Sequence, residues 1–238
     1  MKMPIKYYIK LYKLAKSRNK SEKDYFDFEK FQAEMVIKSL KRKDVRLKGA
    51  KVLDIGSGRG GYSYALNKNG AHVASLDIDS ERFALNSRRF VNADAINLPF
   101  KPSSFDIVFC SSIIEHLEEP EKLILEIKRV LKKGGICYLS FPPFWSPVGA
   151  HQFKPFHYLG EKMAIKLARI FYKVRSYSSY NDEYGRLYVM TISKAKRLIR
   201  DSRLRIISIS TRHFPVNFAK APLLSEFLTW HVEFLLQK

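Results

Sequence analysis

The chain has 238 residues, a net charge of +20, two cysteines and 46% apolar side chains. That length can bury a substantial core within one domain. Cys110 and Cys137 both lie in apolar strand patterns, which favours buried thiols over a disulfide or metal framework. No apolar run approaches the ~20 residues that span a bilayer, and the amino terminus lacks the apolar stretch of a signal peptide. We therefore expect a cytoplasmic protein.

The positive charge lies in the flanks of the chain. Residues 1–50 carry 15 basic and 6 acidic side chains and residues 141–238 carry 16 and 6, whereas residues 51–140 carry 12 and 11. We expect a basic N-terminal helical extension, a cofactor-binding half, an insertion, and a C-terminal helix with strands that complete the sheet. These segments cover residues 1–48, 49–141, 142–190 and 191–238.

Two flanking segments have the pattern of basic amphipathic helices. The first has Lys2, Lys6, Lys10 and Lys13 on one face, with Ile5, Tyr8, Ile9 and Tyr12 on another. The second has Lys162, Lys166, Arg169 and Lys173 opposite Met163, Leu167, Ile170 and Phe171. Such helices can lie on an anionic membrane or bind RNA phosphates, and a merely solvated face explains the pattern equally well.

A further helix precedes the first strand, because Phe28, Phe31, Met35 and Leu40 form an apolar stripe at helical spacing. The strand at Val52-Leu53 then leads into the glycine-rich segment 54–61, and a helical pattern follows as far as Gly70. Glycines allow a sharp turn and a close approach to a ligand, and the N–H groups of a helix start attract electron-rich atoms. This segment predicts a site for a nucleotide-like cofactor.

The glycines alone leave the cofactor open, because Gly56-x-Gly58-x-x-Gly61 also satisfies the dinucleotide fingerprint. Asp54 stands where a dinucleotide turn usually has an apolar residue, and this acid favours a cofactor with cationic groups. A second strand at residues 73–76 ends in Asp77, which is placed to accept the ribose hydroxyls. A nicotinamide protein would have the same acid at that strand end.

The segment Asp54-x-Gly56-x-Gly58-x-Gly60 resembles the first motif of class I S-adenosylmethionine-dependent methyltransferases. Three later features also match: Asp77, the segment 92–95 (Asn-Ala-Asp-Ala), and residues 114–117 (Ile-Glu-His-Leu) after a fourth strand at 105–110. The last of these is typical of the small-molecule branch of that superfamily. The resemblance runs from about Lys51 to Phe141.

The resemblance implies an α/β fold, with a Rossmann-like, seven-stranded, mostly parallel sheet and helices on both faces. It also implies S-adenosyl-L-methionine as the cofactor. The cofactor-binding residues that it implies are Asp54, Ile55, Gly56, Ser57, Gly58, Gly60, Asp77, Ile78, Asp94, Ala95 and Ser111.

Local sequence patterns also predict the helices and strands after residue 120. Pro120 can open a helix whose core face runs from Leu123 to Leu131 and whose end is Gly134, and residues 136–140 then form the fifth strand. A helix at 193–201 and strands at 205–211 and 229–236 come last. A C-terminal helix is the competing interpretation of the final segment.

Residues 142–190 are longer than a compact crossover needs, and they are rich in aromatic side chains. They follow the carboxyl end of a strand, so we expect a lid or acceptor pocket, with an aromatic satellite core as the alternative. The candidate substrate contacts are Phe144, Trp145, His151, His157 and Tyr158. His151 is the candidate general base because Gly149-Ala150 gives it a flexible approach, although a lone loop histidine is more often structural.

Two other motifs point away from particular activities. Pro142-Pro143-Phe144 resembles a motif of amino-methyltransferases but follows the fifth strand rather than the fourth, which disfavours nucleic-acid adenine methylation. Some quinone-precursor O-methyltransferases bind magnesium through a Glu-x-x-Glu-His segment, and here Ser112 replaces the first carboxylate while Glu115 and His116 remain. We therefore expect no metal site.

The sequence thus predicts methyl transfer from S-adenosylmethionine to an oxygen or nitrogen of a small or lipid-linked, anionic acceptor. The basic flanks leave two alternatives: an RNA methyltransferase, and a non-catalytic scaffold that contacts an anionic membrane or a partner protein. The oligomeric state stays open.

Overall fold

The computed structural model describes residues 5–81, 83–85, 89–173, 177–182, 186–212, 214, 216–221 and 224–238. Lys2, which belongs to the predicted basic face of the first helix, lies outside these residues. The chain divides into two compact units. We call residues 2–110 and 129–137 the N-terminal unit, and residues 111–128 and 138–238 the C-terminal unit.

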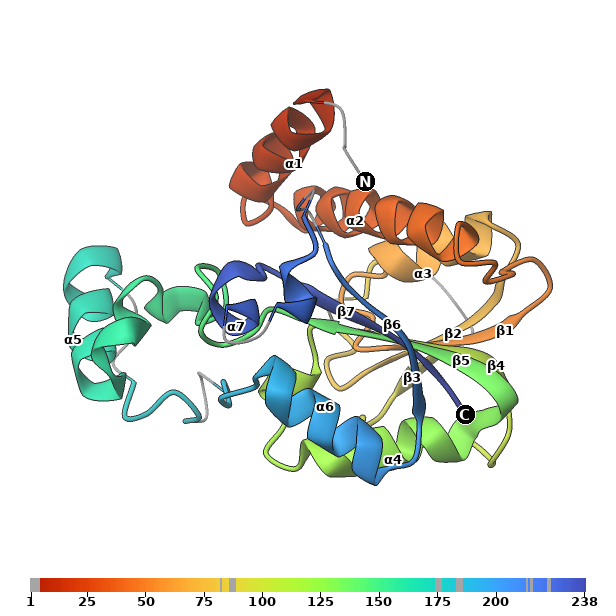
Figure 1. Cartoon of the computed structure of the whole chain (residues 1–238). Coiled ribbons are helices and arrows are strands. Elements are labelled where there is room, and N and C mark those ends of the chain that lie inside the picture. Colours follow the sequence, from red (N-terminus) through yellow and green to blue (C-terminus); the bar gives the residue numbers. More distant parts are fainter. Residues whose placement is uncertain are drawn as a thin grey trace. The chain divides into compact units, whose positions relative to one another are not determined.

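The seven strands have the order β3-β2-β1-β4-β5-β7-β6, which confirms the predicted α/β class (Figure 1). Their bounds are β1 Lys51–Ile55, β2 His72–Asp77, β3 Phe90–Asn92, β4 Phe105–Ser111, β5 Leu131–Phe141, β6 Arg205–Thr211 and β7 Val232–Gln237. β1 pairs in parallel with β2 and β4, in a register that sets Leu53 opposite Ala74 and Val108. β2 pairs in parallel with β3, and β6 pairs antiparallel with β7. The sheet is therefore mixed: the pairs among β1, β2, β3 and β4 are parallel, and β6 and β7 are antiparallel.

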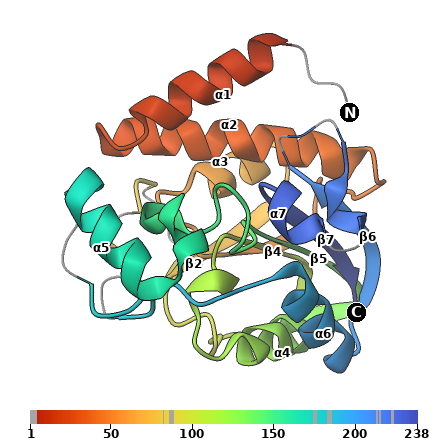
Figure 2. The same ribbon diagram turned by 60° about the vertical axis from the view of Figure 1, so that its left-hand side comes forward.

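The helices of the N-terminal unit are α1 Ile5–Ser17, α2 Glu22–Lys41 and α3 Gly61–Lys68. Ser21 caps α2 by accepting a hydrogen bond from the Asp24 N–H, as expected of a serine before a helix. α2 lies alongside α3 in both views (Figures 1 and 2). Tyr7 of α1 stacks on Phe31 of α2 with ring centroids 5.2 Å apart. This ring contact packs α1 against α2 within the N-terminal unit.

The C-terminal unit contains α5 Glu161–Tyr172, α6 Ile192–Asp201, α7 Ser225–Leu228 and most of α4 Pro120–Val130. Its 3₁₀ helices are η1 Ile114–His116, η2 His151–Phe153, η3 Phe156–Leu159 and η4 Phe218–Lys220. Thr191 caps α6 by accepting from the Lys194 N–H. Among the described residues, every helix is too short or too polar to cross a membrane.

One predicted boundary is wrong. The helix that begins at Pro120 ends at Val130 rather than at Gly134, and Leu131 already belongs to β5. Strand pairing overrides the local stop signal here: β5 lies next to β4 in the sheet, and Lys132 of β5 also forms an ion pair with Asp106 of β4, with 2.6 Å between Nζ and Oδ1. A Cβ atom on Gly135 would also lie 3.1 Å from the Asp106 carbonyl oxygen. The final segment forms a strand, as the alternation indicated, and the alternative of a C-terminal helix is wrong.

The aromatic residues of the insertion form a satellite core, the alternative that the sequence left open. Phe144, Phe153 and Tyr180 are buried in it, together with small residues of α5, and Trp145 and Tyr177 pack against it. Tyr184 lies outside the described residues. Both cysteines are buried free thiols, in agreement with the strand patterns.

Candidate functional site

The glycine-rich turn is held at the carboxyl end of β1 by backbone hydrogen bonds. The N–H groups of Gly56 and Ser57 donate to the Leu76 carbonyl at 2.8 and 3.0 Å, which fastens the turn to β2. Gly58 and Gly60 have φ values of +52° and +89°, which L side chains rarely adopt. The predicted turn therefore exists, and glycine is required at these positions for conformational reasons.

Asp77, predicted to bind ribose, lies against this turn. Its Oδ2 accepts a hydrogen bond from the Gly58 N–H at 2.8 Å, and its Oδ1 accepts from the Asp79 N–H at 3.0 Å. Two predicted cofactor residues from different strand ends thus lie in contact. A carboxylate oxygen accepts more than one hydrogen bond, so Asp77 keeps acceptor capacity for a ligand. The adjacent Ile78 side chain is 61% exposed.

Asp54 lies in the interior of the unit. Its Oδ2 accepts from the Ser63 hydroxyl at 2.6 Å, and the Ser63 oxygen lies 2.7 Å from the Ser75 hydroxyl oxygen. Burial raises the pKa of Asp54 to about 7. This carboxyl links β1 to α3 and β2. Its predicted contact with a cofactor stays a prediction.

The other predicted cofactor residues differ in exposure. Ile55 and Ser57 are buried, and the Ser57 hydroxyl has no hydrogen-bond partner among the described residues. Asp94 is exposed, and its Oδ1 accepts from the Ile96 N–H at 3.1 Å in a local turn that also contains the half-buried Ala95. Ser111, in the C-terminal unit, accepts a hydrogen bond from the Ser140 hydroxyl at 3.0 Å. Their cofactor roles stay predictions.

Sequence reasoning missed the contribution of α2 to the turn. Glu29 Oε2 accepts from the Gly61 N–H at 3.1 Å, and burial raises the pKa of Glu29 to about 7. Arg59 pairs with Glu22 and lies over the ring of Tyr25, with 3.9 Å between its Cζ and the ring centroid. The apolar stripe of α2 indicated a packed helix, but no local pattern indicates which polar residues of that helix meet the turn.

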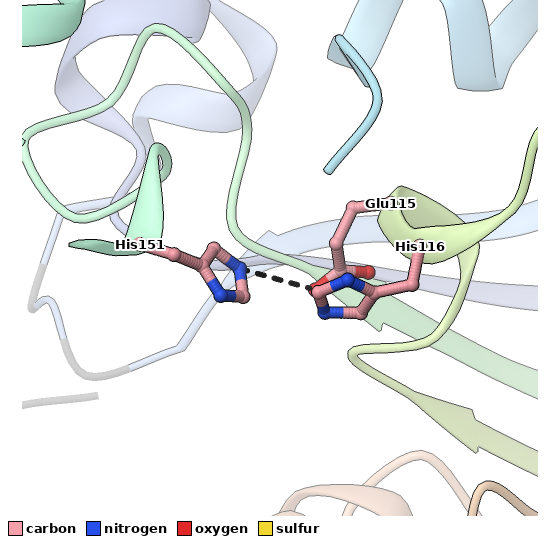
Figure 3. Close-up of side chains that lie close together, drawn as sticks. All are labelled: Glu115, His116 and His151. Atoms are coloured by element: carbon pink, nitrogen blue, oxygen red, sulfur yellow. Dashed lines mark ion pairs between the residues drawn. The ribbon is translucent and has the colours of Figure 1, made fainter. Parts of the chain in front are cut away.

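In the C-terminal unit, the Glu115 carboxylate and the rings of His116 and His151 point toward one another (Figure 3). Each residue offers one ligand atom, and these atoms all lie within 4.8 Å of one another. His151 Nε2 is 3.9 Å from Glu115 Oε1, and the rings of His116 and His151 form a T-shaped pair. In the sequence, Glu115 and His116 form one segment and His151 lies apart from them, and no local pattern predicts that η1 and η2 bring the three together.

Burial dominates the electrostatics of this cluster. Glu115 is 1% exposed, and its burial raises its pKa to about 8. The pKa of His116 is lowered, because burial disfavours the charged imidazolium. Backbone hydrogen bonds hold η1 in place: the Tyr188 N–H donates to the Glu115 carbonyl at 2.8 Å.

The remaining candidate substrate residues lie together in the insertion. Phe144 is 2% exposed and makes ring contacts with Trp145 and His157. Burial lowers the pKa of His157, and the Tyr158 hydroxyl donates to the Trp145 carbonyl at 2.9 Å. His151 lies instead with Glu115 and His116. Contact of any of these residues with an acceptor stays a prediction.

A buried ion pair lies in the same unit, and the positive charge of its Arg212 partly offsets the effect of burial on the pKa of Glu115. Arg212 Nε is 3.2 Å from Glu233 Oε1, and both side chains are at most 8% exposed. Arg212 Nη2 also donates to the hydroxyls of Tyr138 and Ser140 at 2.5 and 2.7 Å. The sequence predicted neither partner of this network, because its members come from distant strands.

Comparison with known proteins agrees with this geometry. Residues 53–139 match the family described as methyltransferase domain. A demethylmenaquinone methyltransferase of Clavibacter sepedonicus is 41% identical over 106 residues, which cover 40% of this chain and 43% of that protein. An uncharacterized methyltransferase of Mycolicibacterium vanbaalenii is 27% identical over 198 residues, 79% of this chain and 76% of the relative. The matched segment thus spans less than half of the first relative.

The fold has solved counterparts. A crystal structure of an S-adenosylmethionine-dependent methyltransferase from Mesorhizobium loti superposes with a TM-score of 0.58, covering 84% of this chain and 96% of that chain at 18% identity. Residues 53–139 thus match a methyltransferase-domain family, and the fold is that of a solved S-adenosylmethionine-dependent methyltransferase, the class that the sequence motifs resemble. The cofactor of this class is S-adenosyl-L-methionine.

The residues of the turn fit that cofactor. A Cβ atom on Gly58 would lie 2.6 Å from Glu29 Oε1, and the φ of +52° at this position also favours glycine. The buried Ser57 hydroxyl and the Asp77 carboxylate add polar groups beside the backbone N–H groups of the turn. This combination suits a ligand that carries a ribose and a charged chain.

Proposed function

We propose that this chain transfers a methyl group from S-adenosylmethionine to an oxygen or nitrogen of a small or lipid-linked, anionic acceptor. The observation that carries the proposal is the contact between Asp77 and the Gly58 N–H, which joins the two strand ends that hold a nucleoside in this fold class. When bound, the cofactor supplies an electrophilic methyl group.

The residues of the N-terminal unit have distinct roles in this proposal. Backbone N–H groups of the turn bind electron-rich atoms of the cofactor, Asp77 accepts from its ribose hydroxyls, and Asp94 lies in the segment predicted to bind the adenine. Glu29 stabilises the turn from α2 by accepting from Gly61. Much of the rate enhancement in methyl transfer comes from alignment of the reactants in a cleft from which water is excluded.

Two observations support the acceptor class. One relative is named for demethylmenaquinone, which favours a small or lipid-linked acceptor. The basic flanks favour an acceptor with negative charge. His151 stays the predicted general base: its imidazole lies beside a buried carboxylate, where it could act as a base or as a ligand.

Calorimetry tests cofactor binding directly. We expect the purified chain to bind S-adenosylmethionine in the micromolar range and Asp77→Ala to lose that binding. Asp201→Ala, which removes an exposed carboxylate of α6, is the matched control and should bind as the wild type does. Absence of heat with S-adenosylmethionine, together with tight binding of a nicotinamide dinucleotide, would refute the proposal.

A second measurement separates the acceptor classes. If RNA were the acceptor, the chain would be retained on RNA with an affinity that falls steeply with salt, and methyl groups would enter RNA. Cofactor binding without turnover on broad acceptor panels, together with vesicle binding, would instead indicate a non-catalytic scaffold. The proposal requires methyl transfer to a small or lipid-linked molecule.

A further inference from the structure

We propose that Glu115, His116 and His151 bind one divalent transition-metal ion of the zinc type. The site lies entirely within the C-terminal unit and does not depend on the proposed methyl transfer. Its ligands would be one carboxylate oxygen and two imidazole nitrogens, a set found in many zinc and non-haem iron sites.

The geometry is that of an expanded metal site. The three ligand atoms lie within 4.8 Å of one another, and His151 Nε2 is 3.9 Å from Glu115 Oε1. Ligands on a tetrahedral zinc ion at about 2.0–2.1 Å lie roughly 3.4 Å apart, so binding needs an inward shift of about 1 Å. The His151 side chain is 31% exposed and belongs to the short helix η2, so we expect the shift to occur chiefly at this residue.

The Glu115 carboxylate provides a second, independent observation. It is 1% exposed, and neither of its oxygens has a hydrogen-bond partner among the described residues. Buried polar atoms are nearly always hydrogen-bonded, and an exception calls for an explanation such as a bound ion. The carboxylate points at the two imidazole rings, where a cation would supply the missing interactions (Figure 3).

His116 has the arrangement of a metal ligand. Its Nδ1 lies 2.8 Å from the Arg186 carbonyl oxygen, and a carbonyl can only accept a hydrogen bond. Nδ1 therefore carries the proton, which leaves the lone pair on Nε2 available for a metal. Metal-binding histidines commonly donate their other N–H to a backbone carbonyl in this way, and the bond fixes both tautomer and ring orientation.

The donor set also decides which ion binds. Magnesium prefers six oxygen ligands, whereas imidazole nitrogens with a carboxylate suit zinc and its neighbours. The sequence predicts no magnesium site, because Ser112 replaces the first carboxylate of the magnesium-binding segment. It does not indicate that His151 lies beside Glu115 and His116. Three protein ligands leave at least one coordination position for water or for an oxygen-containing ligand.

A metal titration tests the proposal. The full chain is stripped with chelator, desalted and titrated with cobalt(II) chloride, whose visible absorption reports coordination. We expect one equivalent of cobalt to bind, one equivalent of zinc to displace it, and excess magnesium to leave the spectrum unchanged. Absence of a cobalt band, or displacement by magnesium, would overturn the proposal.

Variants locate the site. Glu115→Gln, His116→Gln and His151→Ala should each weaken cobalt binding at least ~10-fold, whereas His72→Ala, at an exposed position in β2, should leave it unchanged. His151→Ala keeps the test decisive if a buried variant fails to fold, because this side chain is partly exposed. Unchanged cobalt affinity in a folded His151→Ala protein would contradict the assignment.

A metal-bound imidazole has no lone pair for a proton, so cobalt binding would also exclude the general-base role of His151.

Discussion

Glu29 Oε2 accepts a hydrogen bond from the Gly61 N–H at 3.1 Å, so a helix of the basic N-terminal extension is fastened to the first turn of α3. The carboxylate lies at a helix N-terminus, where negative charge is stabilised. Burial nevertheless dominates and raises its pKa to about 7. The extension therefore contributes a titrating group to the glycine-rich turn, in addition to positive charge.

The pKa of Glu29 predicts a pH-dependent stability. Between its ordinary value of 4.5 and about 7, the folded state holds a proton that the unfolded state has lost. The contribution of Glu29 to the free energy of unfolding should therefore fall as the pH rises through this window, with a slope of at most about 1.4 kcal/mol per pH unit. The raised pKa values of Asp54 and Glu115 add slopes of the same sign. Glu29→Gln should flatten this profile in denaturant titrations that span the same window. Glu34→Gln, at an exposed position of α2, should keep the wild-type slope; an unchanged slope in Glu29→Gln would contradict the prediction.

Gly61 should tolerate no side chain. A Cβ atom there would lie 2.7 Å from both the Lys30 nitrogen and the Phe26 carbonyl oxygen, and backbone atoms of α2 cannot move aside cheaply. We expect Gly61→Ala to cost about 1–3 kcal/mol of unfolding free energy or more. Gly49→Ala is the comparison: it has φ +78° and nothing within 4 Å of an added Cβ, so it should cost only about 1–2 kcal/mol of backbone strain. Equal stability of Gly61→Ala and the wild type would show that α2 does not pack as described.

The buried pair of Arg212 and Glu233 should be sensitive to loss of one partner. Arg212→Met leaves a buried carboxylate without its cation, and we expect a loss of about 3–5 kcal/mol in urea unfolding. The double variant with Glu233→Gln should lose less than the sum of the two single variants, because the side chains share one interaction. If the loss of stability in the double variant equals the sum of the losses in the single variants, Arg212 and Glu233 do not stabilise each other.

The exposed face of α5 predicts binding to anionic vesicles. Ile170 and Phe171 of α5 (Figure 1) are 59% and 66% exposed, and the same helix carries the exposed basic residues Lys162, Lys166 and Arg169. Apolar side chains flanked by lysines are typical of helices that lie on charged bilayers. Co-sedimentation should be strong with phosphatidylserine vesicles, weak with phosphatidylcholine vesicles, and reduced in Ile170→Ser/Phe171→Ser. Equal sedimentation of the variant and the wild type would contradict this role.

Much of the cofactor half could be predicted because its signals are local. The glycines of residues 56–60 have positive φ values that other residues rarely adopt, so sequence and backbone conformation are tightly linked there. β2 and β4 follow from short apolar runs between turn residues. The end of the helix after Pro120 could not be predicted from local signals. Gly134 is a typical residue for a helix end, but β5, which lies next to β4, already begins at Leu131.

The rest of the site depends on contacts between distant parts of the chain. Glu29 meets Gly61 because α2 packs on α3, and no spacing within α2 indicates this contact. His151 lies beside Glu115 because the insertion folds back onto η1, where the Tyr188 N–H donates a hydrogen bond to the Glu115 carbonyl. Many aromatic residues in one segment are compatible with an acceptor pocket and with a satellite core. Their number alone therefore did not predict the satellite core that forms in the insertion.

Transfer of a labelled methyl group measures the proposed activity itself. The purified chain is incubated with methyl-labelled S-adenosylmethionine and a cell extract containing RNA, lipids and small metabolites, and the label is followed through solvent extraction and nuclease digestion. We predict label in a nuclease-resistant small-molecule or lipid fraction, and none with Asp77→Ala. Label that appears only in nuclease-sensitive material, or equal labelling by Asp77→Ala, would contradict the account.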